Sequence, residues 1–232
     1  ENFRKAVSLN GDFAEAQCEL AIALADDGER EAARNHFLNA LEIQPNYADA
    51  YYHYALLLVE LKDVEEARNN LEKVTEVDQN YALAYYQKAR LLTNPDDFED
   101  ARKNFETAID INPDFIDAHY YMGKLLTGGV ATAKDGSIVD RTDLALAKEN
   151  FLQVLEIDPS HAKALYNLAR ILLEEGNLKE AKSRLFKALD IDSKYSKAHY
   201  LLGNVLYGLG DPAKAKEHYA SSIEHYQENP PA

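Results

Sequence analysis

The fold is decided by a 34-residue stretch, residues 48–81, which reads ADAYYHYALLLVELKDVEEARNNLEKVTEVDQNY. In its second half, Ala67 is followed four positions later by Leu71 and three positions after that by Val74. Offsets of three and four residues place side chains on one face of an α-helix. The first half carries its own apolar stripe around Ala55. We therefore expect two amphipathic helices that pack against each other.

The same pattern recurs along the whole chain. The alanine of the second helix returns at spacings of 34, 34, 46, 34 and 34 residues, at Ala33, Ala67, Ala101, Ala147, Ala181 and Ala215. The stripe of the first helix returns with it and carries a small residue at Ala21, Ala55, Ala89, Gly123, Ala169 and Gly203. Small residues on one helix opposite bulky ones on the next let antiparallel helices approach closely. Each repeat is therefore predicted to be a helical hairpin.

The start of the second helix is marked by an acidic or amide side chain, which is Asp63 in the stretch quoted above. Such side chains accept hydrogen bonds from the unpaired amides of the first helical turn. Glu66 follows three residues later, as in a capping box, where the glutamate reaches back to the first amide. We expect both halves of this capping box.

Six copies of the pattern in register resemble the tetratricopeptide repeat, a family with two helices per 34 residues. The resemblance implies an all-α fold, a right-handed α-solenoid superhelix of antiparallel helix pairs, whose concave wall is lined mainly by the first helix of each pair. The sequence departs from the family in lacking tryptophan and in placing histidines, His119 and His199, where a bulky aromatic is usual. We expect these two histidines to be packed.

In one continuous solenoid domain, the repeats are expected at 14–47, 48–81, 82–115, 116–161, 162–195 and 196–229. Residues 1–13 are interpreted as the end of a preceding second helix, and 230–232 fall on the start of a further repeat. We therefore expect a fragment of a longer array, because solenoids usually end in a capping repeat. The fourth repeat has an insertion at 130–141, two β-prone runs around Asp135-Gly136 that suit a small hairpin. It is either a tolerated surface insertion or an extra contact element beside the groove.

Composition excludes several classes of protein. The chain has 25 Lys and Arg against 40 Asp and Glu, a net charge of −15, which argues against nucleic-acid binding because phosphate contacts need a basic face. The longest apolar run, 54–59, is far shorter than a membrane span, so no membrane insertion is expected. Cys18 is the only cysteine, so no disulfide framework is expected, and a reducing, cytoplasmic compartment is favoured.

Catalytic chemistry finds almost no support in the sequence. The seven histidines do not form the paired spacing with glutamate that a zinc hydrolase needs, and no glycine-rich phosphate loop is present. Cys18 has no histidine in register, which disfavours a nucleophile. We expect no enzyme activity, no catalytic residue, no metal and no cofactor.

The predicted concave wall carries tyrosines and cations at recurring positions. The positions that face the groove are taken from the family resemblance, and they give a candidate peptide-binding set of Tyr52, Tyr86, Arg90, Tyr120, Lys124, Tyr166, Asn167, Arg170, Lys197, Tyr200 and Asn204. Two alternatives stay open: the tyrosines are either background packing or ligand contacts, and the cations either bind a ligand or balance neighbouring carboxylates.

Charge is unevenly divided along the chain. Residues 1–116 hold 11 basic and 24 acidic side chains, a net charge of −13, whereas 117–232 hold 14 and 16, a net charge of −2. We therefore predict a protein-protein interaction scaffold whose groove binds a peptide or protein segment, with its acidic part towards Arg90, Lys124 and Arg170. The alternatives are a targeting or assembly arm of a larger multidomain enzyme or secretion machine, and a module that self-associates head to tail through uncapped ends.

Overall fold

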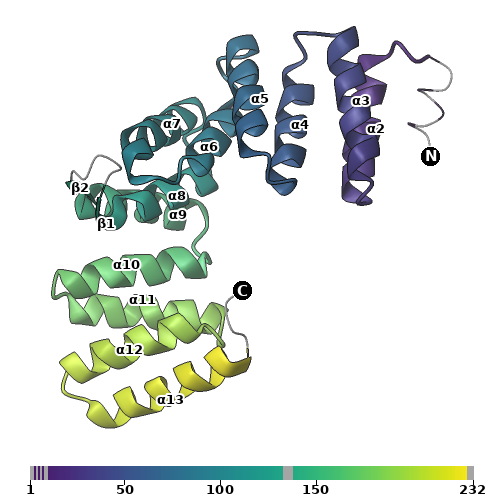
Figure 1. The fold of residues 1–232 in the computed structure, drawn as a ribbon. Coiled ribbons are helices and arrows are strands. Elements are labelled where there is room, and N and C mark those ends of the chain that lie inside the picture. The colour runs from purple at the N-terminus through teal and green to yellow at the C-terminus, as the bar shows by residue number, and fades with distance from the viewer. Residues whose placement is uncertain (1–2, 4, 6, 8–9, 133–137, 229–232) are drawn as a thin grey trace. The chain divides into compact units, whose positions relative to one another are not determined.

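The computed structural model describes Phe3, Lys5, Val7 and residues 10–132 and 138–228. At 129–132, 138–141, 227 and 228 it describes the backbone alone. Within this part, twelve α-helices follow one another as consecutive pairs (Figure 1). The predicted all-α solenoid fold of antiparallel helix pairs is confirmed. The chain divides into two compact units, an N-terminal unit of Glu1–Pro113 and a C-terminal unit of Asp114–Ala232. That the six expected repeats form one continuous domain remains a prediction.

The N-terminal unit contains three helix pairs, α2 and α3, α4 and α5, and α6 and α7. A short 3-10 turn, η1, precedes α7. Their bounds are α2 Ala14–Asp26, α3 Arg30–Ile43, α4 Ala48–Glu60, α5 Val64–Val77, α6 Ala82–Leu91, η1 Pro95–Asp97 and α7 Phe98–Ile111. Of the predicted helix remnant at 1–13, Phe3, Lys5 and Val7 are helical and residues 10–13 are not, while the other six residues lie outside the described part of the chain.

The C-terminal unit contains the other three helix pairs and a β-hairpin between the helices of its first pair. Their bounds are α8 Ile116–Leu126, β1 Thr127–Thr132, β2 Ile138–Thr142, α9 Leu144–Ile157, α10 Ala162–Glu174, α11 Leu178–Ile191, α12 Ser196–Gly208 and α13 Pro212–Glu228. Within this unit, α10 to α13 stack as successive layers (Figure 1). Residues 230–232, predicted to begin a further repeat, lie outside the described residues.

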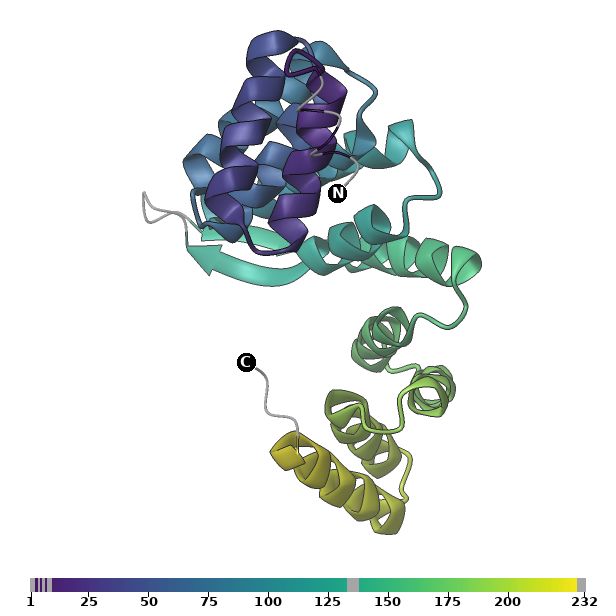
Figure 2. The ribbon, with the colours of Figure 1, turned by 90° about the vertical axis from the view of Figure 1, so that its right-hand side faces the viewer.

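The two β-prone runs of the insertion form paired strands, as predicted. Strands β1 and β2 run antiparallel, with Val130 opposite Asp140 and Thr132 opposite Ile138, and form a two-stranded ribbon (Figure 2). The expected turn at Asp135-Gly136 lies outside the described residues. The role of the ribbon, a tolerated insertion or a contact element, remains a prediction.

Each helix pair is held together by a small residue facing a bulky one. The recurring alanines of the second helices are all buried. At Gly123, an added Cβ would lie 2.8 Å from Cε1 of Phe151, and at Gly203 the ring of Tyr219 is closer still. Since real Cβ atoms do not approach other atoms so closely, only glycine fits opposite these rings.

Four of the turns inside the helix pairs place one residue in the left-handed region of backbone conformation. Glycine occupies this position in three turns, with φ of +81° at Gly28, +75° at Gly176 and +83° at Gly210. In the α4–α5 turn the position is taken by Lys62, with φ of +63°. A side chain there costs about 1–2 kcal/mol, because its Cβ crowds the following carbonyl oxygen.

Lys62→Gly should therefore stabilise the protein. We expect the free energy of unfolding to rise by up to about 1 kcal/mol, because relief of strain outweighs the larger entropy of glycine in the unfolded chain. Urea denaturation followed by circular dichroism measures the change. Gly176→Ala is the opposite substitution at the matching turn and should destabilise; equal effects of both variants would contradict the explanation.

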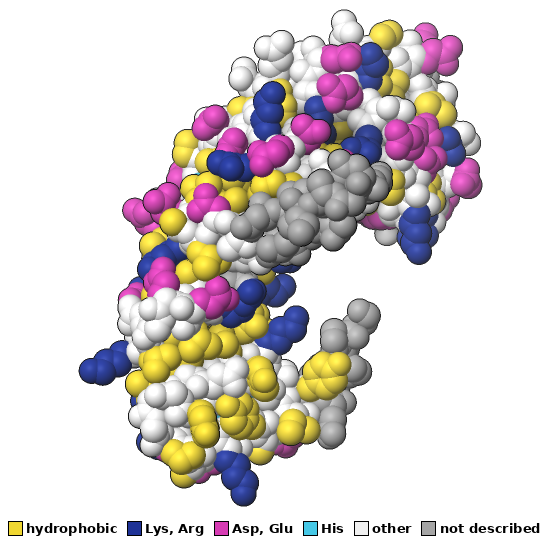
Figure 3. Space-filling view, turned by 60° about the vertical axis from the view of Figure 1, so that its left-hand side comes forward, with side chains coloured by type: hydrophobic (Ala, Val, Ile, Leu, Met, Phe, Trp, Pro, Cys, Tyr) yellow, Lys and Arg dark blue, Asp and Glu magenta, His cyan; other side chains and the backbone are white. Residues whose placement is uncertain are grey.

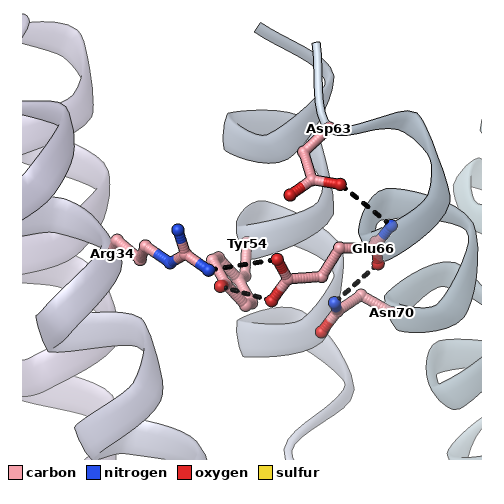
Figure 4. Close-up of polar contacts among 5 residues, drawn as sticks. All are labelled: Arg34, Tyr54, Asp63, Glu66 and Asn70. Atoms are coloured by element: carbon pink, nitrogen blue, oxygen red, sulfur yellow. Dashed lines mark hydrogen bonds and ion pairs between the residues drawn. The ribbon is translucent and has the colours of Figure 1, made fainter. Parts of the chain in front are cut away.

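A partly buried polar network joins the first two helix pairs (Figure 4). The hydroxyl of Tyr54 on α4 donates to Oε1 of Glu66 at 2.8 Å, and Nη2 of Arg34 on α3 donates to Oε2 at 3.1 Å. The Asn70 amide donates to the backbone oxygen of Glu66 at 2.8 Å. Burial, reinforced by the Glu66 carboxylate, raises the pKa of Tyr54 to about 12, so its hydroxyl remains a donor at neutral pH.

The capping box predicted here is only half formed. Asp63 accepts a hydrogen bond from the amide of Glu66 at 3.3 Å, as expected. Glu66, however, does not reach back to the Asp63 amide, which donates instead to the Leu58 oxygen at 2.9 Å. The second half of the prediction is wrong because the buried hydroxyl of Tyr54 and the guanidinium of Arg34 hold the carboxylate, and neither contact is visible in the local sequence.

Tyr54→Phe should cost about 1 kcal/mol of unfolding free energy, because it removes the hydrogen bond to Glu66 and leaves the ring in place. Tyr51→Phe, in the same helix, is the matched control: its hydroxyl donates to the Pro45 oxygen at an exposed site, so the change should be near zero. Urea denaturation midpoints compare the two. Equal midpoints would show that the buried bond contributes nothing.

Candidate peptide-binding site

A cavity of about 790 Å³ lies within the C-terminal unit. Helices α8 and α10 and the connection from α11 to α12 form most of its wall, and α12 and α13 complete it. It is lined by Tyr120, Lys124, Lys163, Tyr166, Asn167, Arg170, Asp192, Lys194, Tyr195, Ser196, Lys197, His225 and Tyr226.

The lining is strongly cationic. Five of its side chains are Lys or Arg, and Asp192 is the only carboxylate among the described lining residues. On the face drawn in Figure 3, acidic side chains crowd the α2–α7 region at the top and are sparse over α10–α13 at the bottom. A cluster of one charge sign attracts ligands of the other sign, so the charge of this lining is compatible with an acidic ligand.

Four of these cations lack a carboxylate partner. Among the described residues, no Asp or Glu lies within ion-pair distance of Lys124, Lys163, Arg170 or Lys197. Their local contacts are of another kind. The Lys124 ammonium lies 5.0 Å from the ring centroid of Tyr121, and Arg170 Nη1 donates to Oδ1 of Asn167 at 3.4 Å. The alternative that these cations merely balance neighbouring carboxylates stays open, but no ion pair among the described residues supports it for this group.

Tyr120 and Tyr166 each pack against a residue in the connection between their own helix pair and the next one. The Tyr120 ring lies 5.0 Å from that of His161, and the Tyr166 ring lies 5.2 Å from that of Tyr195. Burial raises the pKa of Tyr120, Tyr166 and Tyr195 above the usual value. These phenols therefore stay protonated at neutral pH and can donate hydrogen bonds to a carboxylate.

Six of the predicted site residues line this cavity, namely Tyr120, Lys124, Tyr166, Asn167, Arg170 and Lys197. Tyr200 and Asn204 do not line it. Tyr200 is 57% exposed with its ring 5.7 Å from that of Tyr219, whose hydroxyl donates to Oδ1 of Asn204 at 2.9 Å.

The three remaining predicted residues belong to the N-terminal unit. Tyr52 and Tyr86 are only 6% and 5% exposed, and the Tyr52 ring packs 5.2 Å from that of Tyr81. The Arg90 guanidinium lies 5.4 Å from the centroid of the Tyr86 ring. Background packing is therefore the main role visible for these two tyrosines, and a ligand contact by them remains a prediction.

The candidate set left out seven lining residues, namely Lys163, Asp192, Lys194, Tyr195, Ser196, His225 and Tyr226. Lys194 and Tyr195 lie in a connection, whereas the family pattern gives groove positions only on first helices. His225 and Tyr226 belong to α13, which has 17 residues against 14 in α11. The lack of a proline before Pro230 is not a signal for this longer helix, because α5 and α11 are not followed by a proline either and have 14 residues each.

Features of catalytic sites are weak in the part of the chain that the structure describes. Burial, with help from the nearby Glu19 charge, raises the pKa of Cys18 to about 12, so this thiol is a poor nucleophile at neutral pH. No group of three or more His, Cys, Asp or Glu side chains is placed to hold a metal ion among the described residues. Likewise, none of the described helices combines the length and apolar character of a membrane crossing.

Comparison with family models identifies the class of protein. A tetratricopeptide repeat model matches residues 24–91, 139–187 and 172–232, and a second tetratricopeptide repeat model matches 82–115. The chain therefore belongs to the tetratricopeptide repeat family. The comparison with curated proteins found no match.

Solved structures of similar fold include several tetratricopeptide repeat (TPR) proteins. YrrB, described as a TPR protein with an unusual peptide-binding site, is 26% identical, with a TM-score of 0.64 over 85% of this chain and 96% of YrrB. PilF of Pseudomonas aeruginosa is 17% identical with a TM-score of 0.74, over 94% and 93% of the two chains. PilW, a type IV pilus biogenesis factor, is 18% identical with a TM-score of 0.69, over 93% of each chain. The last two show likeness of fold alone.

Proposed function

We propose that this chain is a non-catalytic interaction scaffold, and that the cavity of the C-terminal unit binds an extended, acidic segment of another protein. The tetratricopeptide fold supports the general role of a protein-protein interaction scaffold. The finer proposal is carried by one observation: Lys124, Lys163, Arg170 and Lys197 line one cavity, and none of them forms an ion pair with an Asp or Glu among the described residues. An acidic peptide supplies the missing charges.

The polar groups of the cavity suit an extended peptide. Lys124 and Arg170 lie on α8 and α10, the first helices of two successive pairs. Each of them can form an ion pair with a carboxylate of the ligand. The Asn167 side-chain amide donates to the Lys163 oxygen at 2.9 Å, which leaves its Oδ1 to accept from a peptide amide as well as from Arg170. The tyrosine hydroxyls and ring faces supply contacts that do not depend on charge.

The electrostatic attraction between these cations and a charged ligand acts only over a short distance. At ordinary salt the attraction between exposed charges is screened over roughly 10 Å, so the tyrosines and Asn167 must supply much of the specificity. The likeness to YrrB, which has a peptide-binding site, supports a peptide as the ligand. The same site would serve a targeting or assembly arm of a larger enzyme or secretion machine, whereas head-to-tail self-association would not need it.

Reversing two cations should abolish the preference for acidic ligands. Lys124→Glu with Arg170→Glu should weaken binding of a labelled Asp- and Glu-rich peptide by about tenfold or more, because both carboxylate contacts become repulsive. Fluorescence anisotropy at 50 mM and 500 mM salt measures the affinity, which should fall with salt for the unaltered protein.

A matched control separates local from overall charge. Lys179→Glu with Lys187→Glu makes the same change in net charge on the exposed surface of α11, away from the cavity lining, and should leave the affinity nearly unchanged. Equal weakening by both double variants would reject the cavity as the binding site.

A further inference from the structure

In three helix pairs, a side-chain hydrogen bond joins the two helices at the same interface position. The fourth residue of the first helix meets the seventh residue of the second. The ring Nδ1 of His36 lies 2.6 Å from Oε1 of Gln17 in α2–α3, and Nδ1 of His119 lies 2.9 Å from Oδ1 of Asn150 in α8–α9. In α12–α13 both partners are histidines, and Nδ1 of His199 lies 2.9 Å from Nδ1 of His218.

The two histidine–amide pairs can hold a protonated ring. The Gln17 amide nitrogen donates to the Gly11 oxygen and the Asn150 amide nitrogen donates to the Leu146 oxygen, each at 2.9 Å, which turns the amide oxygens towards the histidines. The histidine must then donate through Nδ1–H. An imidazolium carries a hydrogen at that nitrogen as well, so the hydrogen bond survives protonation.

The hydrogen bond of the histidine–histidine pair does not survive protonation of both rings. Nε2 of His199 lies 3.0 Å from the Ser193 backbone oxygen, which can only accept, so Nε2 carries the hydrogen. In the neutral ring Nδ1 of His199 is then the acceptor, and His218 donates to it through its own Nδ1–H. A proton added to His199 would set two N–H groups against each other across 2.9 Å. The pair, unlike two unfolded histidines, cannot accept a proton on each ring.

The surroundings of the pair also disfavour positive charge. His199 is 9% exposed, its ring lies 5.4 Å from that of His225 on α13, and Phe186 of α11 meets the His218 ring edge-on at 6.1 Å. A further cation, Lys182, lies over the Phe186 ring, while Glu217 on α13 is the neighbouring group that favours protonation. Burial and the His199 ring together lower the pKa of His218 below its usual value.

We propose that the His199–His218 pair is a proton-sensitive latch that holds α13 on α12 at neutral pH and loosens it on acidification. The direction of the change in stability with pH follows from the number of protons that the folded and unfolded states bind. Because the folded pair binds fewer protons than the unfolded pair, the stability is fully present above a pH of about 6.5 and is lost as the pH falls below it. Since α13 also supplies His225 and Tyr226 to the cavity, loosening would remove part of that wall. Only this last consequence rests on the proposed function.

Hydrogen exchange of the full chain, measured by mass spectrometry and corrected for intrinsic exchange rates, tests the latch without any peptide. For one excluded proton and an unfolded pKa near 6.5, the opening constant of α12–α13 should rise about tenfold between pH 7.5 and pH 5.5. The pair α6–α7 contains no histidine and serves as the internal reference. No relative increase in α12–α13 would overturn the proposal.

Two variants remove the latch by copying pairs that the chain already uses. His218→Asn reproduces the histidine–asparagine pair of α8–α9, and His199→Gln reproduces the glutamine–histidine pair of α2–α3. Either variant, once circular dichroism shows that it is folded at pH 7.5, should lose most of the tenfold increase. If both keep the full increase, the acid sensitivity lies elsewhere and the latch is refuted.

Discussion

The whole architecture depends on how closely the two helices of each pair can approach. A small residue on the first helix lies against a ring or a branched side chain on the second, and at Gly123 and Gly203 even a methyl group would collide with the facing ring. This close contact brings the fourth residue of one helix within hydrogen-bond distance of the seventh residue of the other. The polar pairs, including His199 with His218, exist because the apolar ones set the helix separation.

The sequence predicts the helix pairs well because their apolar periodicity is local. It also predicts that His119 and His199 are packed, which their burial confirms. It fails where the partner lies elsewhere in the chain. Glu66 does not cap its own helix because Tyr54 and Arg34 hold its carboxylate. Packing is one of the two alternatives for the groove tyrosines, but the residue that packs on Tyr166, which is Tyr195, is not predicted by the sequence. Periodicity within a helix does not reveal which connection will cover its side chains.

Net charge gives only a coarse view of this molecule. The overall charge of −15 argues against a basic nucleic-acid binder, yet a cavity in the same chain gathers four cations that form no ion pair with an Asp or Glu among the described residues. The sequence shows that the two halves of the chain differ in net charge. The structure adds that Lys163 and Lys197 share one cavity with Lys124 and Arg170. Screening makes such local arrangements matter more to a ligand than the total charge.

The fit between glycine and ring also limits how such a chain can change its length. Gly203 accommodates Tyr219, whereas the corresponding residues of α10 and α11 are Ala169 and Leu185, both fully buried. If α10 replaced α12, the methyl group of Ala169 would collide with the ring of Tyr219. If α12 replaced α10, Gly203 would leave a void beside Leu185. Duplication or deletion therefore preserves packing only when it carries a whole hairpin, which makes the hairpin the unit of recombination.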